Sequence, residues 1–271
     1  MSRIALVSGA ASGIGLETTL SLARTGWTVY AGFRPDGRSA PKPKPQGPGL
    51  IHWLPLDVTD RAARVAAAGV IKSAHERLDA LVNSAGIQAS GPLEEIPEAT
   101  LREVMEVNFF GAVNLTRDCL PLMRRSGGGV IVMVSSLSGL IGLPFDGVYA
   151  ASKFALEGAS ESLRYELEPF GIKVALVEPG AYATSLSDRS SSARTGASAY
   201  AAFEQTRGRP ATGTNAPDPS EAASVIVSTI TEAAPQLHVP CGAQAVSVVR
   251  RLRELDETQR HELALRASGL I

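Results

Sequence analysis

Tyr149 and Lys153 are the residues of this sequence whose types and spacing point most directly to chemistry. They stand four residues apart in the segment Val-Tyr-Ala-Ala-Ser-Lys-Phe, and a helix would place them one turn apart on the same face. The ammonium group would then lie beside the phenol and lower its pKa from about 10, because a nearby cation favours the phenolate. Tyr149 would then exchange protons as a general acid or base. Taken alone, the pair is also compatible with a surface tyrosine beside a lysine.

The rest of the chain has the pattern of a parallel α/β sheet. Short runs rich in valine, isoleucine and leucine alternate with longer stretches of helical period, which is typical of repeated β-α units. We therefore expect an α/β fold, a doubly wound parallel sheet (Rossmann fold) of about seven strands flanked by helices, as a single domain over residues 1–271. The predicted strands are Arg3 to Ser8, Thr28 to Phe33, Ile51 to Asp57, Ala80 to Asn83, Val130 to Ser135, Lys173 to Glu178 and Gln236 to Pro240.

Two regions depart from this alternation. Residues 35–50 contain prolines too closely spaced for a regular helix, so we expect a loop there. The region from about 185 to 220 is rich in small and polar residues, with one possible helical turn at Tyr200 to Gln205, and is predicted to be a substrate loop or lid. The closing stretch Arg250 to Arg266 is predicted to form one amphipathic helix that covers the core.

Composition and charge restrict the kind of partner. With 271 residues, of which 44 % are hydrophobic and 20 % charged, the chain can bury one sizeable core. Its formal net charge of −1 supplies no excess positive charge for nucleic acid or anionic lipid. The two cysteines, Cys119 and Cys241, are too few for a disulfide framework or a metal site, and no apolar stretch reaches membrane-spanning length. We expect a cytoplasmic protein with a small-molecule partner and no metal, membrane or nucleic acid.

A glycine-rich turn follows the first predicted strand. It reads Ser8-Gly9-Ala10-Ala11-Ser12-Gly13-Ile14-Gly15, and a predicted helix begins directly after it. The glycines permit a tight turn, a close approach of the backbone to a ligand, and close packing of the helix on the strand. A diphosphate can then bind at the N-terminus of the helix. The place of this turn in an alternating β-α chain predicts a dinucleotide site.

The chain resembles the short-chain dehydrogenase/reductases, which use NAD or NADP. The resemblance extends from about residue 3 to residue 185 and rests on several motifs in the order and spacing of the family. Besides the glycine turn, these are Asp57-Val58, Asn83-Ser84-Ala85-Gly86, Asn108, Ser136, Tyr149-x3-Lys153, and Pro179-Gly180 followed by Thr184. The segment Ser135 to Gly158 is most similar to the branch of 17β-hydroxysteroid and retinol dehydrogenases. The sequence departs from the family at Ser8, at Ser84 and in the proline-rich stretch, where a threonine, a second asparagine and a helix are usual.

The resemblance implies catalytic roles for four residues. Tyr149 would be the general acid in reduction and the base in oxidation, while Lys153 would lower its pKa and hold the nicotinamide ribose. Ser136 would hydrogen-bond the reacting oxygen, and Asn108 would help to anchor the lysine through a water. The residues implied in cofactor binding are Gly9, Ser12, Gly13, Ile14, Gly15, Arg34, Asp57, Val58, Asn83, Ala85, Gly86, Tyr149, Lys153, Pro179, Gly180 and Thr184.

The end of the second predicted strand indicates which nicotinamide cofactor is used. An acidic residue there would hydrogen-bond a ribose 2′-hydroxyl and repel a 2′-phosphate. The sequence has Phe33-Arg34 at this place, and Arg34 can pair with a phosphate. The hydroxyl of Ser12 and the basic residues of the loop after Arg34 also favour a 2′-phosphate. Alternatively, those basic residues only keep the loop in contact with solvent. We therefore expect NADP(H), with NAD(H) as the alternative.

The expected walls of the substrate pocket are mostly apolar, which favours a hydrophobic ketone, aldehyde or alcohol of steroid-like or aromatic kind. Alternatively, the same residues only pack beneath a lid. The residues expected in this pocket are Gln88, Ser138, Leu143, Phe145 and Tyr182.

The function that these patterns favour is an NADP-dependent oxidoreductase that interconverts a ketone or aldehyde and an alcohol by hydride transfer. Two alternatives remain open: a catalytically silent nucleotide-binding regulator, and an epimerase or dehydratase on the same fold. The helices expected at Glu98 to Arg125 and Tyr149 to Phe170 resemble those through which family members pair, so a homodimer or homotetramer is expected. The four histidines lie near no motif, and we expect them to be surface residues or to have structural roles only: His52, His75, His238 and His261.

Overall fold

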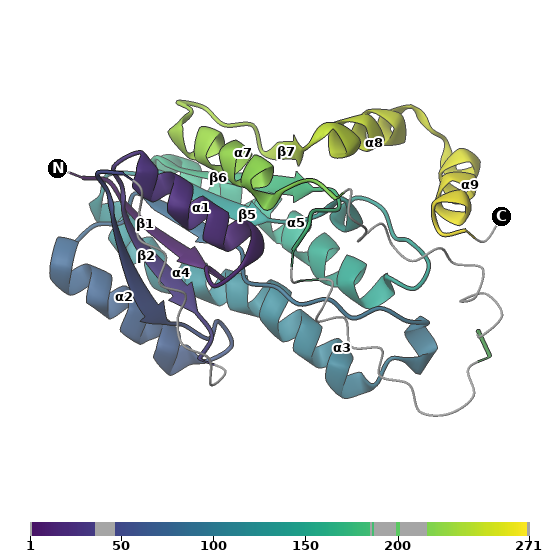
Figure 1. The fold of residues 1–271 in the computed structure, drawn as a ribbon, viewed down its shortest axis with the longest axis horizontal. Coiled ribbons are helices and arrows are strands. Elements are labelled where there is room, and N and C mark those ends of the chain that lie inside the picture. Colours follow the sequence, from purple (N-terminus) through teal and green to yellow (C-terminus); the bar gives the residue numbers. More distant parts are fainter. Residues whose placement is uncertain (1, 36–46, 185, 187–198, 201–215, 270–271) are drawn as a thin grey trace.

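The computed structural model describes residues 2–35, 47–184, 186, 199–200 and 216–269. Its centre is a seven-stranded parallel sheet in the order β3-β2-β1-β4-β5-β6-β7 (Figure 1). The predicted α/β class and all seven predicted strands are confirmed, with ends that move by at most two residues. The strands are β1 (Ile4–Ser8), β2 (Thr28–Phe33), β3 (Leu50–Pro55), β4 (Ala80–Asn83), β5 (Gly129–Val134), β6 (Ile172–Pro179) and β7 (His238–Cys241).

Helices connect the strands and cover both faces of the sheet. No helix in the described ranges is both long enough and apolar enough to cross a bilayer. The α-helices are α1 (Gly13–Arg24), α2 (Arg61–His75), α3 (Glu98–Met105), α4 (Ala112–Arg125), α5 (Gly147–Leu167), α7 (Pro219–Thr231), α8 (Ala243–Glu254) and α9 (Glu257–Ala267). The shorter turns are η1 (Leu93–Glu95), the π-helical η2 (Glu106–Gly111), η3 (Leu137–Gly139) and η4 (Glu168–Phe170).

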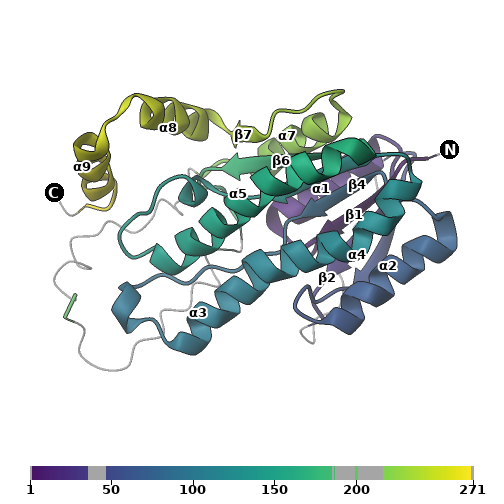
Figure 2. The ribbon, with the colours of Figure 1, turned by 180° about the vertical axis from the view of Figure 1, so that it is seen from behind.

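The central strands of the sheet are buried on both faces, whereas no residue of the edge strand β3 is buried. Figure 1 shows α1 and α7 in front of one face, and Figure 2 shows α2, α4 and α5 in front of the other. Because side chains alternate along a strand, Val7 belongs to the same hydrophobic cluster as Leu22 of α1, while the preceding Leu6 belongs to the cluster that contains Leu115 of α4. This double burial explains why the strands read as nearly continuous apolar runs in the sequence.

The C-terminal region differs from the prediction of one helix that covers the core. The chain breaks after α8 at Leu255, and Asp256 then begins α9 with a capping box, in which its side chain accepts from the backbone of Gln259. None of the residues of α9 is buried, and α8 and α9 extend beyond the end of the sheet (Figure 1). The prediction of a single helix is therefore wrong, and within the stretch from Arg250 to Arg266 only Leu252 of α8 is buried.

The two predicted irregular regions lie mostly outside the described residues. In the proline-rich loop, residues 36–46 are outside them, and the backbone N–H of Gly49 donates to the carbonyl of Ala23 at 3.0 Å on its return to the sheet. In the predicted lid, only Leu186, Ala199, Tyr200 and residues 216–220 are described. Tyr200 contacts the ring of Phe145, with the two ring centres 6.2 Å apart in an edge-to-face arrangement.

Candidate active site

The glycine turn after β1 lies against the turn after β4. β1 and β4 pair directly, so that Ser8 and Asn83 are neighbours at the carboxyl ends of the strands. The buried Ser8 hydroxyl accepts hydrogen bonds from the backbone N–H groups of Ser84 at 3.1 Å and Ala85 at 3.2 Å. Gly9 has a φ of 65°, and a Cβ there would lie 2.7 Å from the Cα of Ala85. The two turns can approach this closely only because Gly9 has no side chain, and the Ser8 hydroxyl holds them together.

The start of α1 forms a cradle for a ligand. A Cβ on Gly15 would collide with the carbonyl oxygen of Gly9, and a Cβ on Gly13 would lie 3.2 Å from the Cβ of Thr184. Gly13 and Ile14 are the first residues of α1, where backbone N–H groups have no acceptor within the helix. The predicted residues of the glycine turn and Thr184 are therefore brought together at a helix N-terminus, an arrangement that fits a diphosphate.

Arg34, Asp57 and Val58 lie just beyond the ends of β2 and β3. Arg34 is exposed directly after the last residue of β2. The Asp57 carboxylate accepts from the backbone N–H of Thr59 at 2.9 Å and from its hydroxyl at 2.7 Å. The carbonyl of the buried Val58 accepts from Arg64 at 2.7 Å. A fixed carboxylate and an exposed cation therefore lie on the side of the glycine turn where an adenosine would bind.

The other predicted cofactor residues lie at the ends of β4 and β6. The buried side chain of Asn83 donates to the hydroxyl of Thr116 at 3.0 Å, which directs it into the interface between β4 and α4. Pro179 is the buried last residue of β6, and a Cβ on the following Gly180 would lie 3.0 Å from Oε1 of Gln244 in α8. Asn83 thus fixes the end of β4 through its side chain, and its expected contact with a cofactor stays a prediction.

Ser136, Tyr149 and Lys153 meet at the end of β5. Tyr149 and Lys153 both lie in α5, as predicted, and both are buried. The Tyr149 hydroxyl is hydrogen-bonded to the side chain of Ser136. The Lys153 Nζ donates to the carbonyl of Val134 at 2.8 Å and lies 5.5 Å from the centre of the Tyr149 ring. A hydroxyl pair with an ammonium group behind it is an arrangement suited to proton transfer.

The electrostatics of this group differ from the expectation. The pKa of Tyr149 is raised, mainly because burial disfavours the phenolate and also because the Asp146 charge lies nearby, while the hydrogen bond with Ser136 opposes the rise. Burial lowers the pKa of Lys153 to about 8, against the opposing attraction of Glu157. The expected lowering of the Tyr149 pKa by Lys153 is therefore wrong for the protein alone. The hydroxyl stays protonated at neutral pH and is ready to donate.

Asn108 holds the framework of this group. It lies in the π-helical turn η2, and its side chain accepts from the backbone N–H of Ile87 at 2.9 Å and donates to the carbonyl of Ile87 at 2.9 Å. The same amide donates to the hydroxyl of Ser152 at 3.0 Å. Ser152 directly precedes Lys153, so Asn108 connects the turn after β4 to the lysine. Ser152 was not predicted as a site residue, although its place between Tyr149 and Lys153 was a signal for it.

On the expected substrate side, two predicted residues converge on a residue that sequence reasoning missed. Ser138 donates to Oδ2 of Asp146 at 2.7 Å, and Gln88 donates to Oδ1 of the same carboxylate at 3.1 Å. Asp146 is 6 % exposed and precedes Tyr149 by three residues. Its negative charge beside the tyrosine was the available signal. The polar residues Gln88 and Ser138 are thus oriented by a buried carboxylate.

Leu143 and Phe145 form the short loop before α5. The carbonyl of Leu143 accepts from the backbone of Asp146 at 3.1 Å, and the carbonyl of Phe145 accepts from Gly91 at 2.9 Å. Phe145 has a φ of 66°, a strained value for a residue with a side chain, at a cost of about 1 kcal/mol or more. The loop after β4 and the loop before α5 are therefore fixed against each other, and Tyr200 packs on Phe145 from the predicted lid.

Tyr182 corrects the expected substrate pocket. Its side chain is buried in the core between the sheet and α7, and its hydroxyl lies 3.3 Å from Sγ of Cys241 in β7. The backbone N–H of Thr184 donates to the carbonyl of Tyr182 at 2.8 Å, a tight turn that separates the directions of the two side chains. Tyr182 is therefore part of the core, and only Thr184 faces the glycine turn.

Asp146 leads to a testable prediction about the pH profile. Asp146→Asn should lower the pKa of Tyr149, because the Asp146 charge is one cause of its rise. The limb of the pH profile of turnover that reports Tyr149 should then move to lower pH. Ser138→Ala is the matched comparison, since it removes a hydrogen bond to Asp146 but leaves the charge. Equal profiles for Asp146→Asn and the wild type would exclude this role of Asp146.

Fold and site together define a class of protein: a nucleotide-binding α/β domain with a hydroxyl and ammonium group for proton transfer beside the nucleotide turn. The family profile described as short chain dehydrogenase matches residues 3–195. The chain belongs to the short-chain dehydrogenase/reductase family.

The curated relatives include a retinol dehydrogenase and a 17-beta-hydroxysteroid dehydrogenase, the two kinds of enzyme that the sequence suggested. The chain is 42 % identical over 187 residues to the uncharacterized oxidoreductase YusZ of Bacillus subtilis, covering 68 % of this chain and 66 % of the relative. It is 41 % identical over 185 residues to human retinol dehydrogenase 8, covering 67 % and 60 %. It is 39 % identical over 194 residues to human 17-beta-hydroxysteroid dehydrogenase type 1, covering 69 % and 58 %. The match thus spans less than two thirds of the length of each of these relatives.

Solved structures match over nearly the whole chain. A short-chain dehydrogenase from Streptomyces avermitilis has a TM-score of 0.78 at 31 % identity and covers 97 % of this chain and 96 % of its own. A short chain dehydrogenase from Burkholderia cenocepacia, solved with NADP, has a TM-score of 0.75 at 26 % identity, with 98 % and 97 % covered. One from Burkholderia phymatum, solved with NAD, has a TM-score of 0.76 at 24 % identity, with 93 % of each chain covered. Proteins of this fold thus bind either nicotinamide cofactor.

Proposed function

We propose that the chain is an NADP-dependent oxidoreductase that interconverts a hydrophobic ketone or aldehyde and the corresponding alcohol. The observation that carries this proposal is the buried group of Ser136, Tyr149 and Lys153 at the end of β5, close to the glycine turn. A nucleotide-binding protein without catalysis has no need of a protonated phenol hydrogen-bonded to a second hydroxyl. Membership of the short-chain dehydrogenase/reductase family supports the same conclusion.

The residues of the chain would orient the substrate and supply the proton. NADPH, when bound, supplies the hydride. The hydroxyls of Ser136 and Tyr149 would donate to the substrate oxygen and stabilise the negative charge that develops on it. Tyr149 would then give its proton to that oxygen, and the Lys153 ammonium group would stabilise the remaining phenolate. The raised pKa of Tyr149 keeps its hydroxyl protonated, and this is the form that donates a proton during reduction.

The choice of NADP rests on the end of β2. Phe33 ends this strand with its ring against Trp53, at 6.5 Å between ring centres, and Arg34 is exposed directly after it. No carboxylate occupies either position, so nothing there would accept from a ribose 2′-hydroxyl or repel a 2′-phosphate. The guanidinium of Arg34 is free to turn toward a phosphate at this edge, because it is solvent-exposed.

Arg34→Ala should weaken the binding of NADPH by about tenfold to a hundredfold and leave NADH nearly unchanged, since a hydrogen bond to a charged group contributes roughly 1.5–3 kcal/mol. Phe33→Asp should lower or reverse the preference for NADPH by repelling the 2′-phosphate. Both effects can be measured by titrating tryptophan fluorescence with each nucleotide. Arg61→Ala, at an exposed arginine of α2, is the matched control. Equal loss of NADPH and NADH affinity in Arg34→Ala would exclude a 2′-phosphate contact.

The proposed substrate class is apolar. Leu143 and Phe145 form a fixed loop next to Tyr149, and the relatives include enzymes named for retinol and a hydroxysteroid. The test is a panel of ketones, aldehydes and alcohols, from small polar compounds to steroids, assayed by the absorbance of NADPH. Turnover confined to small polar compounds would contradict the apolar substrate. Failure of every compound with both cofactors would contradict the proposed activity itself.

We also propose a homodimer or homotetramer. Phe110 in η2 and Phe154 in α5 are 46 % and 48 % exposed, on the helices expected to pair. Large exposed apolar side chains on neighbouring helices support a contact between copies. Analytical ultracentrifugation of the purified chain measures the state directly, and a monomer at all concentrations would contradict the proposal.

A further inference from the structure

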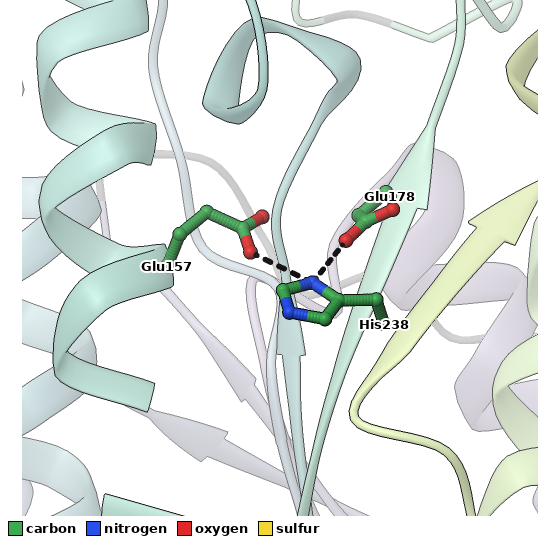
Figure 3. A group of neighbouring side chains, drawn as sticks. All are labelled: Glu157, Glu178 and His238. Carbon is green, nitrogen blue, oxygen red and sulfur yellow. Dashed lines mark hydrogen bonds and ion pairs between the residues drawn. The ribbon is translucent and has the colours of Figure 1, made fainter. Parts of the chain in front are cut away.

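A cluster of ionisable side chains lies outside the candidate active site. Glu157 of α5, Glu178 of β6 and His238 of β7 bring their ligand atoms within 4.8 Å of one another (Figure 3). Nδ1 of His238 lies 2.7 Å from Oε1 of Glu178 and 3.4 Å from Oε2 of Glu157. The residues come from three elements that are far apart in the sequence, so the fold itself places these donors together.

The other ring nitrogen of His238 has a partner of its own. Nε2 lies 3.4 Å from Oε1 of Glu161, a half-exposed residue one turn after Glu157 in α5. Histidines that ligate metals commonly donate their second ring N–H to a carboxylate, which fixes the ring and the tautomer. With its proton on Nε2 facing Glu161, the imidazole presents the lone pair of Nδ1 to Glu157 and Glu178.

Within the described part of the chain, three of the four oxygens of the two buried carboxylates in this cluster lack hydrogen-bond partners, while Oε1 of Glu178 contacts His238. The side chain of Glu157 is 8 % exposed and that of Glu178 is 0 % exposed. Among the described residues, neither oxygen of Glu157 and not Oε2 of Glu178 makes a hydrogen bond of acceptable geometry. Buried charges without partners are costly, so such groups are normally paired with a cation or bound to a metal.

The positive groups around the cluster do not fill its centre. The Lys153 Nζ is committed to the carbonyl of Val134, and Arg253 of α8 is exposed and acts on Glu178 only through its charge. Ser135 lies close to Glu157 and offers a hydroxyl but no charge. Either a proton or a cation must therefore lie between Nδ1 of His238 and the two carboxylates.

We propose that Glu157, Glu178 and His238 form a binding site for a divalent transition-metal cation of zinc type, with Glu161 orienting the histidine. Two carboxylates and one imidazole are a donor set that zinc accepts. Ligands at about 2.1 Å from a tetrahedral zinc lie roughly 3.4 Å apart, which is the separation of Nδ1 and the Glu157 oxygen. The contact with Glu178 would lengthen by several tenths of an ångström as the metal replaces the hydrogen bond.

This site would join three elements of the fold. α5 carries the catalytic tyrosine and lysine, β6 leads into the segment whose Thr184 meets Gly13 of the glycine turn, and β7 leads into α8. The side chain of His238 is 33 % exposed, which gives the ion a route from solvent. The bound ion would therefore stabilise the edge of the sheet next to the active site, in addition to the proposed oxidoreductase function.

Zinc titration of the tag-free full chain tests this site. After treatment with a chelator, isothermal titration with zinc chloride should show one ion per chain, with a Kd of about 1 μM or lower. When the free zinc concentration is a hundred times the Kd, the melting temperature of the protein should rise by about 5 °C or more. Glu157→Gln and His238→Gln should each weaken binding by at least about tenfold, while His261→Gln, at an exposed histidine of α9, should not.

A second measurement on the wild type remains decisive if the variants do not fold. Zinc should shift the imidazole ¹⁵N resonances of one of the four histidines selectively, with the larger change at Nδ1. The His52→Gln, His75→Gln and His261→Gln variants should retain that resonance, which assigns it to His238. Absence of zinc binding would overturn the proposal and leave a proton, in place of a cation, shared among these three side chains. Zinc shifts confined to the other histidines would overturn it equally.

Discussion

Replacing Tyr149 by phenylalanine should lower turnover by a factor of about 100 to 10,000 while leaving the affinity for NADPH within about twofold. The hydroxyl is the only part removed, and it is the group hydrogen-bonded to Ser136 beside the buried Lys153. The ring itself stays, so the buried packing of α5 should survive. Stopped-flow measurement of NADPH oxidation with a saturating ketone gives the turnover, and equilibrium titration gives the affinity.

Tyr165→Phe is the matched control for this variant. Tyr165 lies on the same helix but is 71 % exposed, so its hydroxyl should contribute nothing to turnover. Turnover close to that of the wild type in Tyr149→Phe would mean that another group donates the proton. The assignment of the general acid would then fail, while the fold and the nucleotide site would be unaffected.

Lys153→Met should abolish most of the turnover and weaken the binding of NADPH. The same variant should make the folded protein more stable at neutral pH. The activity falls because the ammonium group no longer supports the Tyr149 phenolate. The stability rises because burial lowers the pKa of Lys153 from its usual 10.5 to about 8. A buried charge that is unfavourable for folding but needed for catalysis is a common conflict between stability and activity.

The pH dependence of stability follows from this shift. Below about pH 8 the folded and unfolded wild-type chains both hold the proton, so the whole cost of burying the ammonium group is present. Between about pH 8 and 10.5 only the unfolded chain holds it, so the stability of the wild type rises with pH. The difference of 10.5 − 8 = 2.5 pKa units corresponds to about 3 kcal/mol at most, from which the lost hydrogen bond to Val134 subtracts roughly 1 kcal/mol.

Thermal melting from pH 7 to 10.5 measures this difference. Lys153→Met should melt several degrees above the wild type at pH 7, and the gap should close as the pH rises. Lys72→Met, at an exposed lysine of α2, should show neither effect. A variant that is less stable than the wild type at pH 7, with a gap independent of pH, would contradict the lowered pKa.

Local patterns were sufficient to predict the sheet and much of the site. The central strands are short apolar runs that are buried on both faces of a parallel sheet. Tyr149 and Lys153 share one helix, so their relation depends on helical spacing alone. The glycine turn is equally local, because its glycines are needed for contacts with neighbouring backbone. The observed ends of several strands differ from the predicted ends by one or two residues, because backbone pairing with the neighbouring strand, rather than the side-chain pattern, decides where a strand ends.

The features that sequence reasoning missed depend on distant residues. Tyr182 is predicted to line the substrate pocket, but its hydroxyl meets Cys241, which is 59 residues later. His238 seemed unrelated to any motif, yet it contacts Glu178, which is 60 residues earlier. The rise in the Tyr149 pKa comes mainly from burial, which no local pattern reports. The prediction of one C-terminal helix failed because the cap at Asp256 outweighs a charged, amphipathic pattern with little to bury.

The π-helical turn from Glu106 to Gly111 joins α3 and α4 into one continuous helical segment. The number of residues in this segment therefore affects the orientation of Asn108 in the site. A π-turn holds one residue more than the α-helical path, so it rotates the side chains before it relative to those after it by about 100°. Val104 of α3 packs beside α5, while Leu115 of α4 packs on the sheet. Asn108 lies in the π-helical turn between them, where the direction of the side chains around the helix axis changes. Deleting one residue from this turn would restore a regular helix and turn the Asn108 amide away from Ile87 and Ser152. A change in the number of residues between α3 and α4 should therefore disturb the site, although no residue of the turn needs to touch a substrate.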